Sequence, residues 1–326
     1  MRTRIGVIGA GFAGTTHARA CRDIDGAEVV AVVAATREEA APLAAECGAR
    51  IVDSAAELGA APDVDLVIVA SPTYLHAEHA VAAARSGKQV FCEKPLARTL
   101  EQGEAIVEAC ESAGVPLAVG HVVRFFPEYQ RAHDLIRDGA IGQPAVATLT
   151  RGSFSVAAVR PWYGDQAKSG GVLLDLMVHD LDTLRWWFGE PTRVYARRVA
   201  AGGLDYALAT LRFAEGLIAH VEASWAEHAG FRTAFEVCGD AGMLVHDSRA
   251  STPLVVQAPD AGTSPAVMPV MAEHESPYGR QMRDLIERLA RGDHPRVGGR
   301  EGLATLSLAF AVDESVRCGE PVAWSP

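Results

Sequence analysis

The sequence predicts an α/β protein with two domains: a doubly wound parallel sheet over residues 1–121, and an α+β domain with a mainly antiparallel open sheet over residues 122–326. Three observations predict this organisation. A glycine-rich turn, Gly9-x-Gly11-x-x-Gly14, joins an apolar run to a potential helix. Apolar runs then alternate with potential helices as far as residue 120. Beyond it, segments that alternate polar and apolar residues prevail.

The first turn combines three glycines with separate physical roles. Gly9 makes the sharp turn, Gly11 lets the backbone approach a pyrophosphate, and Gly14 lets helix and strand pack closely. The helix N-terminus then offers free N–H groups and the positive end of its dipole to phosphates. Alone, such a turn could be a plain corner between strand and helix. Its flanking strand and helix predict a Rossmann dinucleotide site.

Continuous apolar runs in the first domain are typical of buried parallel strands. The predicted strands cover residues 5–8, 28–34, 51–52, 65–70, 89–92 and 115–119. The predicted helices cover residues 15–22, 38–47, 74–86 and 99–112. Pro42 implies that the second helix starts late or kinks. Six strands alternating with helices indicate a doubly wound sheet.

The second domain has strands of alternating pattern at residues 145–152, 193–200, 205–213, 217–225, 231–238 and 243–247. Short turns at 214–216 and 239–242 join consecutive strands, which predicts antiparallel pairing. The predicted helices cover residues 127–137, 172–188, 277–291 and 300–316, and residues 258–269 form the most loop-like stretch.

Composition narrows the class of protein. With 49% hydrophobic and 22% charged residues, the chain is an ordinary soluble globular protein, long enough at 326 residues for two domains. Its net charge of -11 argues against nucleic-acid binding. We find no signal peptide and no apolar stretch of membrane-spanning length. Six scattered cysteines without a C-x-x-C motif predict a reduced cytoplasmic protein.

Lys94 is the first candidate for chemistry. It comes just after a predicted parallel strand, at the edge where open α/β sheets bind ligands. Only three of the 30 basic residues are lysines, so a lysine here stands out. A solvated loop lysine or a salt bridge to Glu93 is the alternative.

Asp175 and His179 stand four residues apart on a predicted helix and so share one face, with Asp182 three residues further on. An acidic residue beside a histidine raises its basicity and orients it, as a general acid/base near neutral pH requires. A self-satisfied pair on a helix surface is the alternative. Gly170 and Gly171 favour the catalytic interpretation, because they would let this helix start close to another surface or ligand.

His76 and His79 have the spacing of metal ligands on a helix, but no third ligand stands at a recognisable distance. We therefore predict no metal site. We expect His79 to be solvated and His76 to line the cofactor edge.

Together the motifs resemble the Gfo/Idh/MocA family of glucose–fructose oxidoreductases and inositol dehydrogenases. They are G-A-G-F-A-G at 9–14, S-P-T-Y-L-H at 71–76, E-K-P at 93–95 and G-G-V-L-L-D-L-M-V-H-D at 170–180. The resemblance implies a nicotinamide-dependent dehydrogenase or reductase that acts on a hydroxyl or carbonyl of a cyclitol, sugar or sugar derivative. It also implies a homodimer or homotetramer formed through the C-terminal sheet.

The resemblance further implies a catalytic group of Lys94, Asp175 and His179. His179 would take the hydroxyl proton while hydride leaves the same carbon, Lys94 would hydrogen-bond that oxygen, and Asp175 would orient the sugar or share the proton relay. The substrate pocket would be lined by Arg124, Arg160, Trp162 and Tyr163. The predicted cofactor-binding residues are Gly9, Gly11, Phe12, Ala13, Gly14, Thr36, Arg37, Ser71, Pro72, His76, Glu93 and Lys94.

One departure concerns the choice of dinucleotide. An NAD site has an acidic residue at the end of the second strand, where this chain has Ala34 and Ala35, followed by Thr36 and Arg37. We therefore expect NADP to be favoured over NAD. If Arg37 merely starts the next helix in solvent, this preference disappears.

Two other functions fit parts of the pattern. A cofactor-binding sensor without turnover would be expected to lack the lysine or the histidine, and both are present. An NAD-assisted glycoside hydrolase of the same fold would keep its dinucleotide tightly bound, and the motifs do not exclude it. The partners that we expect are a small polyol or sugar, with no nucleic acid and no membrane.

Overall fold

The computed structural model describes residues 2–155, 160–201, 204–227, 230–250, 254–257, 266–267 and 275–326. Their contacts divide the chain into two compact units. The first unit combines Met1–Val122 with Glu275–Leu306, and the second combines Val123–His274 with Ser307–Pro326. We describe each unit by itself.

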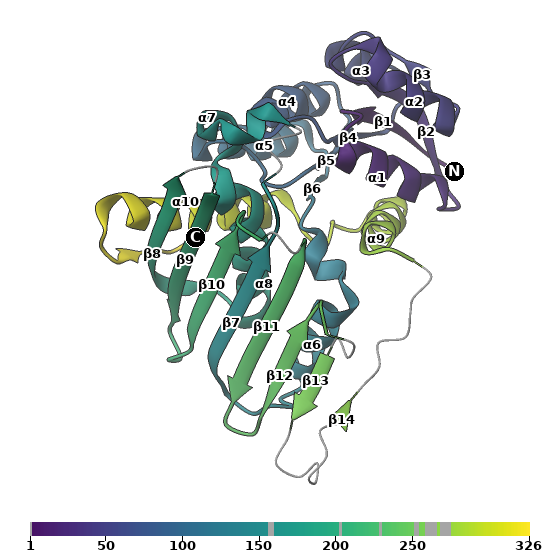
Figure 1. The fold of residues 1–326 in the computed structure, drawn as a ribbon. Coiled ribbons are helices and arrows are strands. Elements are labelled where there is room, and N and C mark those ends of the chain that lie inside the picture. The colour runs from purple at the N-terminus through teal and green to yellow at the C-terminus, as the bar shows by residue number, and fades with distance from the viewer. Residues whose placement is uncertain are drawn as a thin grey trace. The chain divides into compact units, whose positions relative to one another are not determined.

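The first unit contains a six-stranded parallel sheet in the order β3-β2-β1-β4-β5-β6 (Figure 1). The sequence runs outward from β1 in both directions, which is the doubly wound topology predicted from the alternating pattern. The strands are β1 (Thr3–Ile8), β2 (Ala27–Val33), β3 (Arg50–Ile51), β4 (Leu66–Val69), β5 (Gln89–Cys92) and β6 (Leu117–Val119).

Helices cover both faces of this sheet. The helices are α1 (Phe12–Arg22), α2 (Arg37–Cys47), α3 (Ala55–Ala60), α4 (His76–Arg85), α5 (Leu100–Ala113), α9 (Pro277–Arg291) and the first part of α10 (Gly299–Cys318). On one face, α1, α2 and α9 bury apolar side chains against the strands, with Met282 and Ile286 contributed by α9. On the other face Gly6 leaves room for Leu58 of α3, because a Cβ at Gly6 would lie within 2.5 Å of that side chain.

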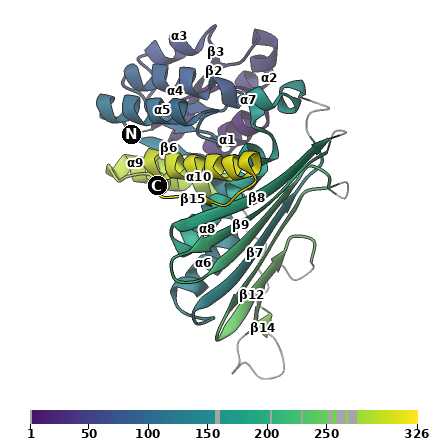
Figure 2. The same cartoon turned by 90° about the vertical axis from the view of Figure 1, so that its left-hand side faces the viewer.

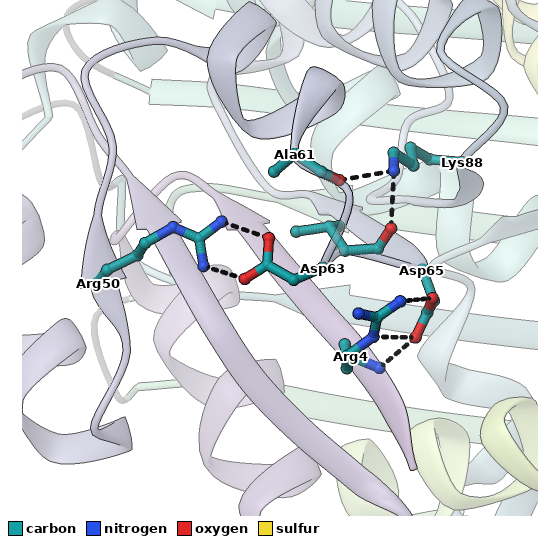
Figure 3. Close-up of polar contacts among 7 residues, drawn as sticks. Arg4, Arg50, Ala61, Asp63, Asp65 and Lys88 are labelled. Carbon is teal, nitrogen blue, oxygen red and sulfur yellow. Dashed lines mark hydrogen bonds and ion pairs between the residues drawn. The ribbon is translucent and has the colours of Figure 1, made fainter. Parts of the chain in front are cut away.

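Polar contacts tie the amino ends of the strands together (Figure 3). Arg4 of β1 forms a two-pronged pair with Asp65, and Arg50 of β3 pairs with Asp63. The ammonium group of Lys88 donates to the carbonyl oxygens of Ala61 and of residue 64, at 2.7 and 2.8 Å. These contacts hold the loop before β4 at the sheet edge opposite the glycine turn.

The second unit contains a nine-stranded sheet in the order β14-β13-β12-β11-β7-β10-β9-β8-β15. All pairs are antiparallel except β7 with β10, which is parallel, so the sheet is mixed but mostly antiparallel. The strands are β7 (Pro144–Gly152), β8 (Pro191–Ala201), β9 (Leu204–Phe213), β10 (Ile218–Ser224), β11 (Arg232–Gly239), β12 (Gly242–Asp247), β13 (Leu254–Gln257), β14 (Ala266–Val267) and β15 (Val322–Ala323).

One face of this sheet carries helices α6 (Pro127–Arg137) and α8 (Val178–Phe188), as Figure 2 shows. Along β9 and β10, buried residues alternate with partly or fully exposed ones, as expected for a sheet with one covered face. A π-helical segment, η5 (Leu173–Met177), leads directly into α8. Short helical turns η1 (Thr73–Leu75), η2 (Val122–Phe125), η4 (Pro161–Gly164) and α7 (Gln166–Ser169) complete the elements.

The structure differs from the predicted elements in a few places. Pro42 does not delay its helix, because α2 begins at Arg37 and is capped by Thr36, whose hydroxyl accepts the N–H of Glu39. The short elements α3, β13, β14 and β15 were not predicted. Of the predicted loop at 258–269, residues 266–267 form β14 and the rest lie outside the described residues.

Within the described residues, no helix is both long and apolar enough to cross a membrane.

Candidate active site

The glycine turn between β1 and α1 has the close backbone approach that its spacing predicts. Gly9 has a φ of +103°, and a Cβ on it would overlap the carbonyl of Ala70 at the end of β4. A Cβ on Gly14 would overlap the carbonyl oxygen of Gly9. Gly11 is the N-cap of α1 and has no side chain, so the first N–H groups of the helix have no side-chain cap. Phe12 begins the helix, with two thirds of its side chain exposed. This cradle fits a pyrophosphate.

Arg37 lies where the second strand leads into α2, as predicted for a contact with the adenosine ribose. It is exposed, and its Nε lies 2.6 Å from Oδ1 of Asp53. Asp53, which follows β3, was not predicted at this place. The charge of Arg37 is therefore partly balanced by a carboxylate of the chain itself.

The segment after β4 carries Ser71, Pro72 and His76. His76 begins α4 and is buried, with Nδ1 2.9 Å from the carbonyl oxygen of Pro95 and Nε2 2.9 Å from the carbonyl oxygen of Ser71. Because both ring nitrogens face carbonyl groups of the chain, neither is directed at a ligand. His79 is partly buried, and its Nδ1 lies 2.9 Å from the hydroxyl of Ser71. The expectation that His79 is solvated is thus wrong in part.

Lys94 lies in the turn after β5 and is joined to Pro95 by a cis peptide bond. It is the one partly exposed residue of the buried run 90–97. Glu93 is buried, and its Oε1 lies 2.5 Å from Nε2 of His17. Burial opposes ionisation of Glu93, but the hydrogen bond and charge of His17 outweigh it, so the pKa of this carboxyl lies below its usual value. The charge of Lys94 and its backbone N–H, which Oε2 of Glu93 accepts at 3.0 Å, lower the pKa of Glu93 as well.

In the second unit, Asp175 and His179 lie on the helix that runs through η5 and α8. They are the two residues of 171–185 that are not buried. The π-helical segment contains Asp175 and ends two residues before His179. Single π-helical turns inside α-helices are frequent at functional sites. Both residues are partly exposed, which is consistent with the prediction that they share one face of the helix.

Two neighbouring acids of the same helix are buried and neutralised. Asp180 forms a two-pronged pair with Arg151 of β7, at 2.8 and 2.7 Å. Asp182 does the same with Arg124, at 2.7 Å for both contacts. Asp182 is therefore no part of an exposed stripe with Asp175 and His179, and two donors of Arg124, a predicted substrate residue, are held by a carboxylate.

The start of this helix is closed by the chain itself. Gly170 and Gly171 both have positive φ, and a Cβ on Gly171 would overlap Arg198 and Asp205. Asp205 accepts the N–H of Val172 at 3.0 Å and is held by Arg198. Gly170 and Gly171 predicted that the start of this helix lies close to another surface or a ligand. In the structure that neighbour is the Arg198–Asp205 ion pair of the same unit.

Three further predicted substrate residues precede this helix. Arg160 is exposed, and the rings of Trp162 and Tyr163 lie 4.0 Å apart. Tyr163 also meets Trp225 edge-on at 6.3 Å. Aromatic surfaces of this kind can contact the C–H face of a sugar ring.

The structure thus gathers the predicted dinucleotide residues and Lys94 at the carboxyl edge of the first sheet. It places Asp175, His179 and the aromatic residues in the second unit. Assembly of the three catalytic residues into one group stays a prediction. Among the described residues, no group of three or more His, Cys, Asp or Glu side chains could hold a metal ion.

Two polar residues of the first unit were missed. His17 looks like an ordinary helix residue in the sequence, and its partner Glu93 is 76 positions away. Asp53 follows a two-residue strand, too short to show a pattern. No local pattern in the sequence marks either residue, because each is placed by its contact with a distant part of the chain.

The doubly wound sheet and its phosphate cradle define a dinucleotide-binding protein, and comparison with known proteins gives the class. Residues 3–121 match the oxidoreductase family with an NAD-binding Rossmann fold, and residues 129–245 match the GFO/IDH/MocA C-terminal domain. The chain belongs to the GFO/IDH/MocA family of oxidoreductases, as its motifs indicated.

Several relatives align with nearly the whole chain. A D-apiose dehydrogenase of Paraburkholderia graminis is 34% identical over 335 residues, covering 97% of this chain and 88% of its own. A myo-inositol 2-dehydrogenase of Thermotoga maritima is 29% identical over 324 residues, 96% of each chain. The structure of a levoglucosan dehydrogenase in complex with NADH and levoglucosan superposes with a TM-score of 0.90 at 25% identity, covering 99% of each chain.

Proposed function

We propose that the chain transfers hydride between a nicotinamide dinucleotide and a hydroxyl or carbonyl carbon of a cyclitol, a sugar or a sugar derivative. The observation that carries the proposal is that Asp175 and His179 remain accessible on a helix whose other acids are buried in ion pairs. Lys94 is likewise accessible within a buried run. Similar proteins include inositol, apiose and levoglucosan dehydrogenases, which supports the substrate class.

Each residue has a distinct role in this proposal. The turn from Gly9 to Gly14 and the start of α1 bind the pyrophosphate. A bound nicotinamide supplies the hydride donor or acceptor. A ring nitrogen of His179 takes the hydroxyl proton, and the ammonium group of Lys94 donates a hydrogen bond to the same oxygen. Asp175 orients the sugar or shares the proton relay. Positioned acid/base groups of this kind contribute roughly 10² to 10⁴ in rate.

For the dinucleotide we propose that NADP is preferred, with NAD as the alternative. Thr36 and Arg37 replace the acidic residue that holds the ribose hydroxyls in NAD sites. Asp53 competes for Arg37, so this preference rests on Arg37 exchanging Asp53 for a 2′-phosphate.

We further propose that the chain forms a homodimer or homotetramer through the exposed face of its nine-stranded sheet. Large apolar side chains are exposed on that face, among them Tyr195, Val199, Leu208 and Ile218. Apolar patches of this kind are typical of interfaces between subunits.

The decisive experiment is a fluorescence titration with NADPH and NADH, followed by an absorbance screen of inositols, aldoses and keto-sugars with the tighter dinucleotide. We expect micromolar binding and turnover of at least one compound. Tight binding without turnover would favour the sensor, and sugar release without a net change in dinucleotide absorbance would favour the glycoside hydrolase. Failure to bind either dinucleotide would remove the proposal.

The assigned roles are tested by Lys94→Ala and His179→Ala. Each should lower turnover about 100-fold or more while the dinucleotide Kd stays nearly unchanged, because neither residue holds the pyrophosphate. Lys168→Ala, at an exposed lysine near Asp165, is the control and should retain turnover. Near-normal rates in the first two variants would remove the mechanism but not the dinucleotide site.

A further inference from the structure

The two residues that flank Lys94 are each held by a buried histidine from a different helix. On one side, Nε2 of His17 in α1 lies 2.5 Å from Oε1 of Glu93. On the other side, Nδ1 of His76 in α4 lies 2.9 Å from the carbonyl oxygen of Pro95. Both imidazoles are almost fully buried. Each ring therefore acts on Lys94 through the residue next to it in the chain, Glu93 or Pro95.

The contact of Glu93 reaches the backbone of Lys94. Oε2 of Glu93 accepts the N–H of Lys94 at 3.0 Å, while Oε1 faces His17. Because an ionised carboxylate only accepts, Nε2 of His17 carries the shared proton. Gly120 leaves room for this carboxylate, since a Cβ there would lie 3.0 Å from it. The carboxylate of Glu93 is thus held by His17 and by the N–H of Lys94, in the space that Gly120 leaves.

His76 joins two segments of the chain. Its second ring nitrogen lies 2.9 Å from the carbonyl oxygen of Ser71, so the ring spans the segment after β4 and the turn that contains Lys94. A neutral imidazole has one N–H and can donate to one of these two carbonyls at a time. Burial lowers the pKa of His76, and the two carbonyls oppose this effect. In either tautomer the buried ring donates to one of the two segments and packs against the other.

Both histidines belong to elements that begin at the predicted dinucleotide site. Helix α1 starts at the glycine turn, and α4 follows Ser71 and Pro72. We propose that His17 and His76 are positioning residues that hold Lys94 from both sides and couple its position to the two segments that receive the dinucleotide. This inference rests on the proposed catalytic function of Lys94.

Conservative variants separate the individual contacts. His17→Leu removes the bond to Glu93, whereas the amide nitrogen of His17→Gln lies near the place of Nε2 and can replace it. In the same way, His76→Asn can keep the Nδ1 contact with Pro95, and His76→Gln can keep the Nε2 contact with Ser71. If the Lys94 turn is what matters, His76→Asn must retain more activity than His76→Gln.

The first measurement is steady-state kinetics with the fastest compound of the sugar screen at saturating dinucleotide. His17→Leu and His76→Gln should lower kcat about 10- to 100-fold, because small displacements of a catalytic group have effects of that size. The NADPH Kd should change by less than about threefold, and His17→Gln and His76→Asn should recover most of kcat. Glu78→Gln changes an exposed side chain of the same helix α4 that lies outside the Lys94 turn, so it is the matched control and should keep kcat.

The second measurement needs no substrate. Reductive methylation with ¹³C-formaldehyde labels the three lysines, so each can be followed by NMR. The Lys94 signal should shift when NADPH binds to the wild-type protein, and this response should be lost in His17→Leu and His76→Gln. The signals of Lys88 and Lys168 serve as internal references.

The outcomes distinguish the two proposals. If Lys94→Ala keeps its turnover, the catalytic function of Lys94 fails, and this inference fails with it. If Lys94→Ala loses turnover but both histidine variants keep kcat and the NMR response, the inference alone is overturned. It is also overturned if activity falls only in proportion to a lowered melting temperature, or if His76→Asn and His76→Gln are equally impaired.

Discussion

Individual lysines of the first unit show how the chain separates structural from chemical roles. Lys88 donates to two backbone carbonyls at the amino end of the sheet and so closes a loop (Figure 3). Lys94 stands at the carboxyl edge, partly exposed between two buried residues. At Lys88 a compact ammonium group lies between two carbonyl oxygens, a place that suits it better than a planar guanidinium group.

Arg37 should set the choice of dinucleotide. Arg37→Ala should weaken NADPH binding about ten- to a hundredfold more than NADH binding, because a charge-assisted hydrogen bond to the 2′-phosphate is lost. Asp53→Asn should act in the opposite direction by freeing Arg37. Fluorescence titrations with both dinucleotides give the ratio of Kd values.

Arg50→Ala is the matched control for this ratio. It also breaks an ion pair of the first unit, with Asp63, but at the opposite edge of the sheet. It should leave the ratio unchanged. Equal weakening of both dinucleotides by Arg37→Ala would mean that Arg37 only starts its helix in solvent.

Glu93 should make stability depend on pH in the acid range. Its pKa is lowered in the folded protein, so its ionised form stabilises the fold above the usual value of 4.5. That stabilisation is lost as the pH falls from 4.5 through the folded pKa. The free energy of unfolding in urea should therefore fall more between pH 6 and pH 3 for the wild type than for Glu93→Gln. The other carboxyl groups titrate in both proteins, so the difference between them reports Glu93. Parallel curves for the two proteins would contradict this.

At the scale of elements, the helix through η5 and α8 is fixed by ion pairs at several points. Asp180 and Asp182 bind buried arginines, and Asp205 caps the first turn. A buried arginine–carboxylate pair is costly to break, since removing one partner leaves an uncompensated charge. These contacts hold the helix in place, so the partly buried Asp175 and His179 keep their orientation.

The close approach at the start of this helix can be measured with a pair of glycines. Gly139→Ala should destabilise the protein by about 1 kcal/mol, because its φ of +74° is unfavourable for alanine although nothing lies within 4 Å of the new Cβ. Gly171→Ala has a similar φ of +67° but also overlaps the Arg198–Asp205 pair. It should cost roughly a further 1 to 3 kcal/mol. Thermal and urea unfolding give both values, and equal losses would show that the ion pair moves aside freely.

Elements with a repeating pattern were predictable, and contacts between distant residues were not. The long strands and helices of both units follow from local periodicity, and Thr99 and Gly114 mark the two ends of α5 as expected. The two-residue strands β14 and β15 contain no period to detect. Pairing of His17 with Glu93, or of Arg124 with Asp182, depends on how the whole unit folds. Hence the sequence indicated which residues could carry chemistry, but not which neighbours hold them.

At the scale of the whole molecule, the nine-stranded sheet combines a covered face with an exposed one. The covered face packs against helices, whereas the exposed face carries apolar side chains together with arginines such as Arg193 and Arg212. These two arginines lie opposite each other on β8 and β9. Like charges in that arrangement repel. An acidic surface placed against them would relieve the repulsion.

The exposed face should determine the oligomeric state. Light scattering coupled to size exclusion should give two or four times the mass of one chain for the wild type. Leu208→Asp should shift it toward the monomer, because a charge is then buried in an apolar interface. Phe231→Asp is the control, since Phe231 is also an exposed large apolar residue but lies outside the strands, just before β11. A monomeric wild type would contradict the proposed assembly.

The short strand β15 has a consequence for solubility. Val322 and Ala323 pair with β8, and Trp324 continues the contact by donating its N–H to Thr192 and its indole N–H to Ser307. An uncovered strand at the margin of a sheet is a template on which other chains aggregate. These three residues shield part of that margin. A chain shortened before Val322 would therefore keep its candidate catalytic residues but expose the edge of β8. We expect such a chain to aggregate while the protein that stays in solution remains active.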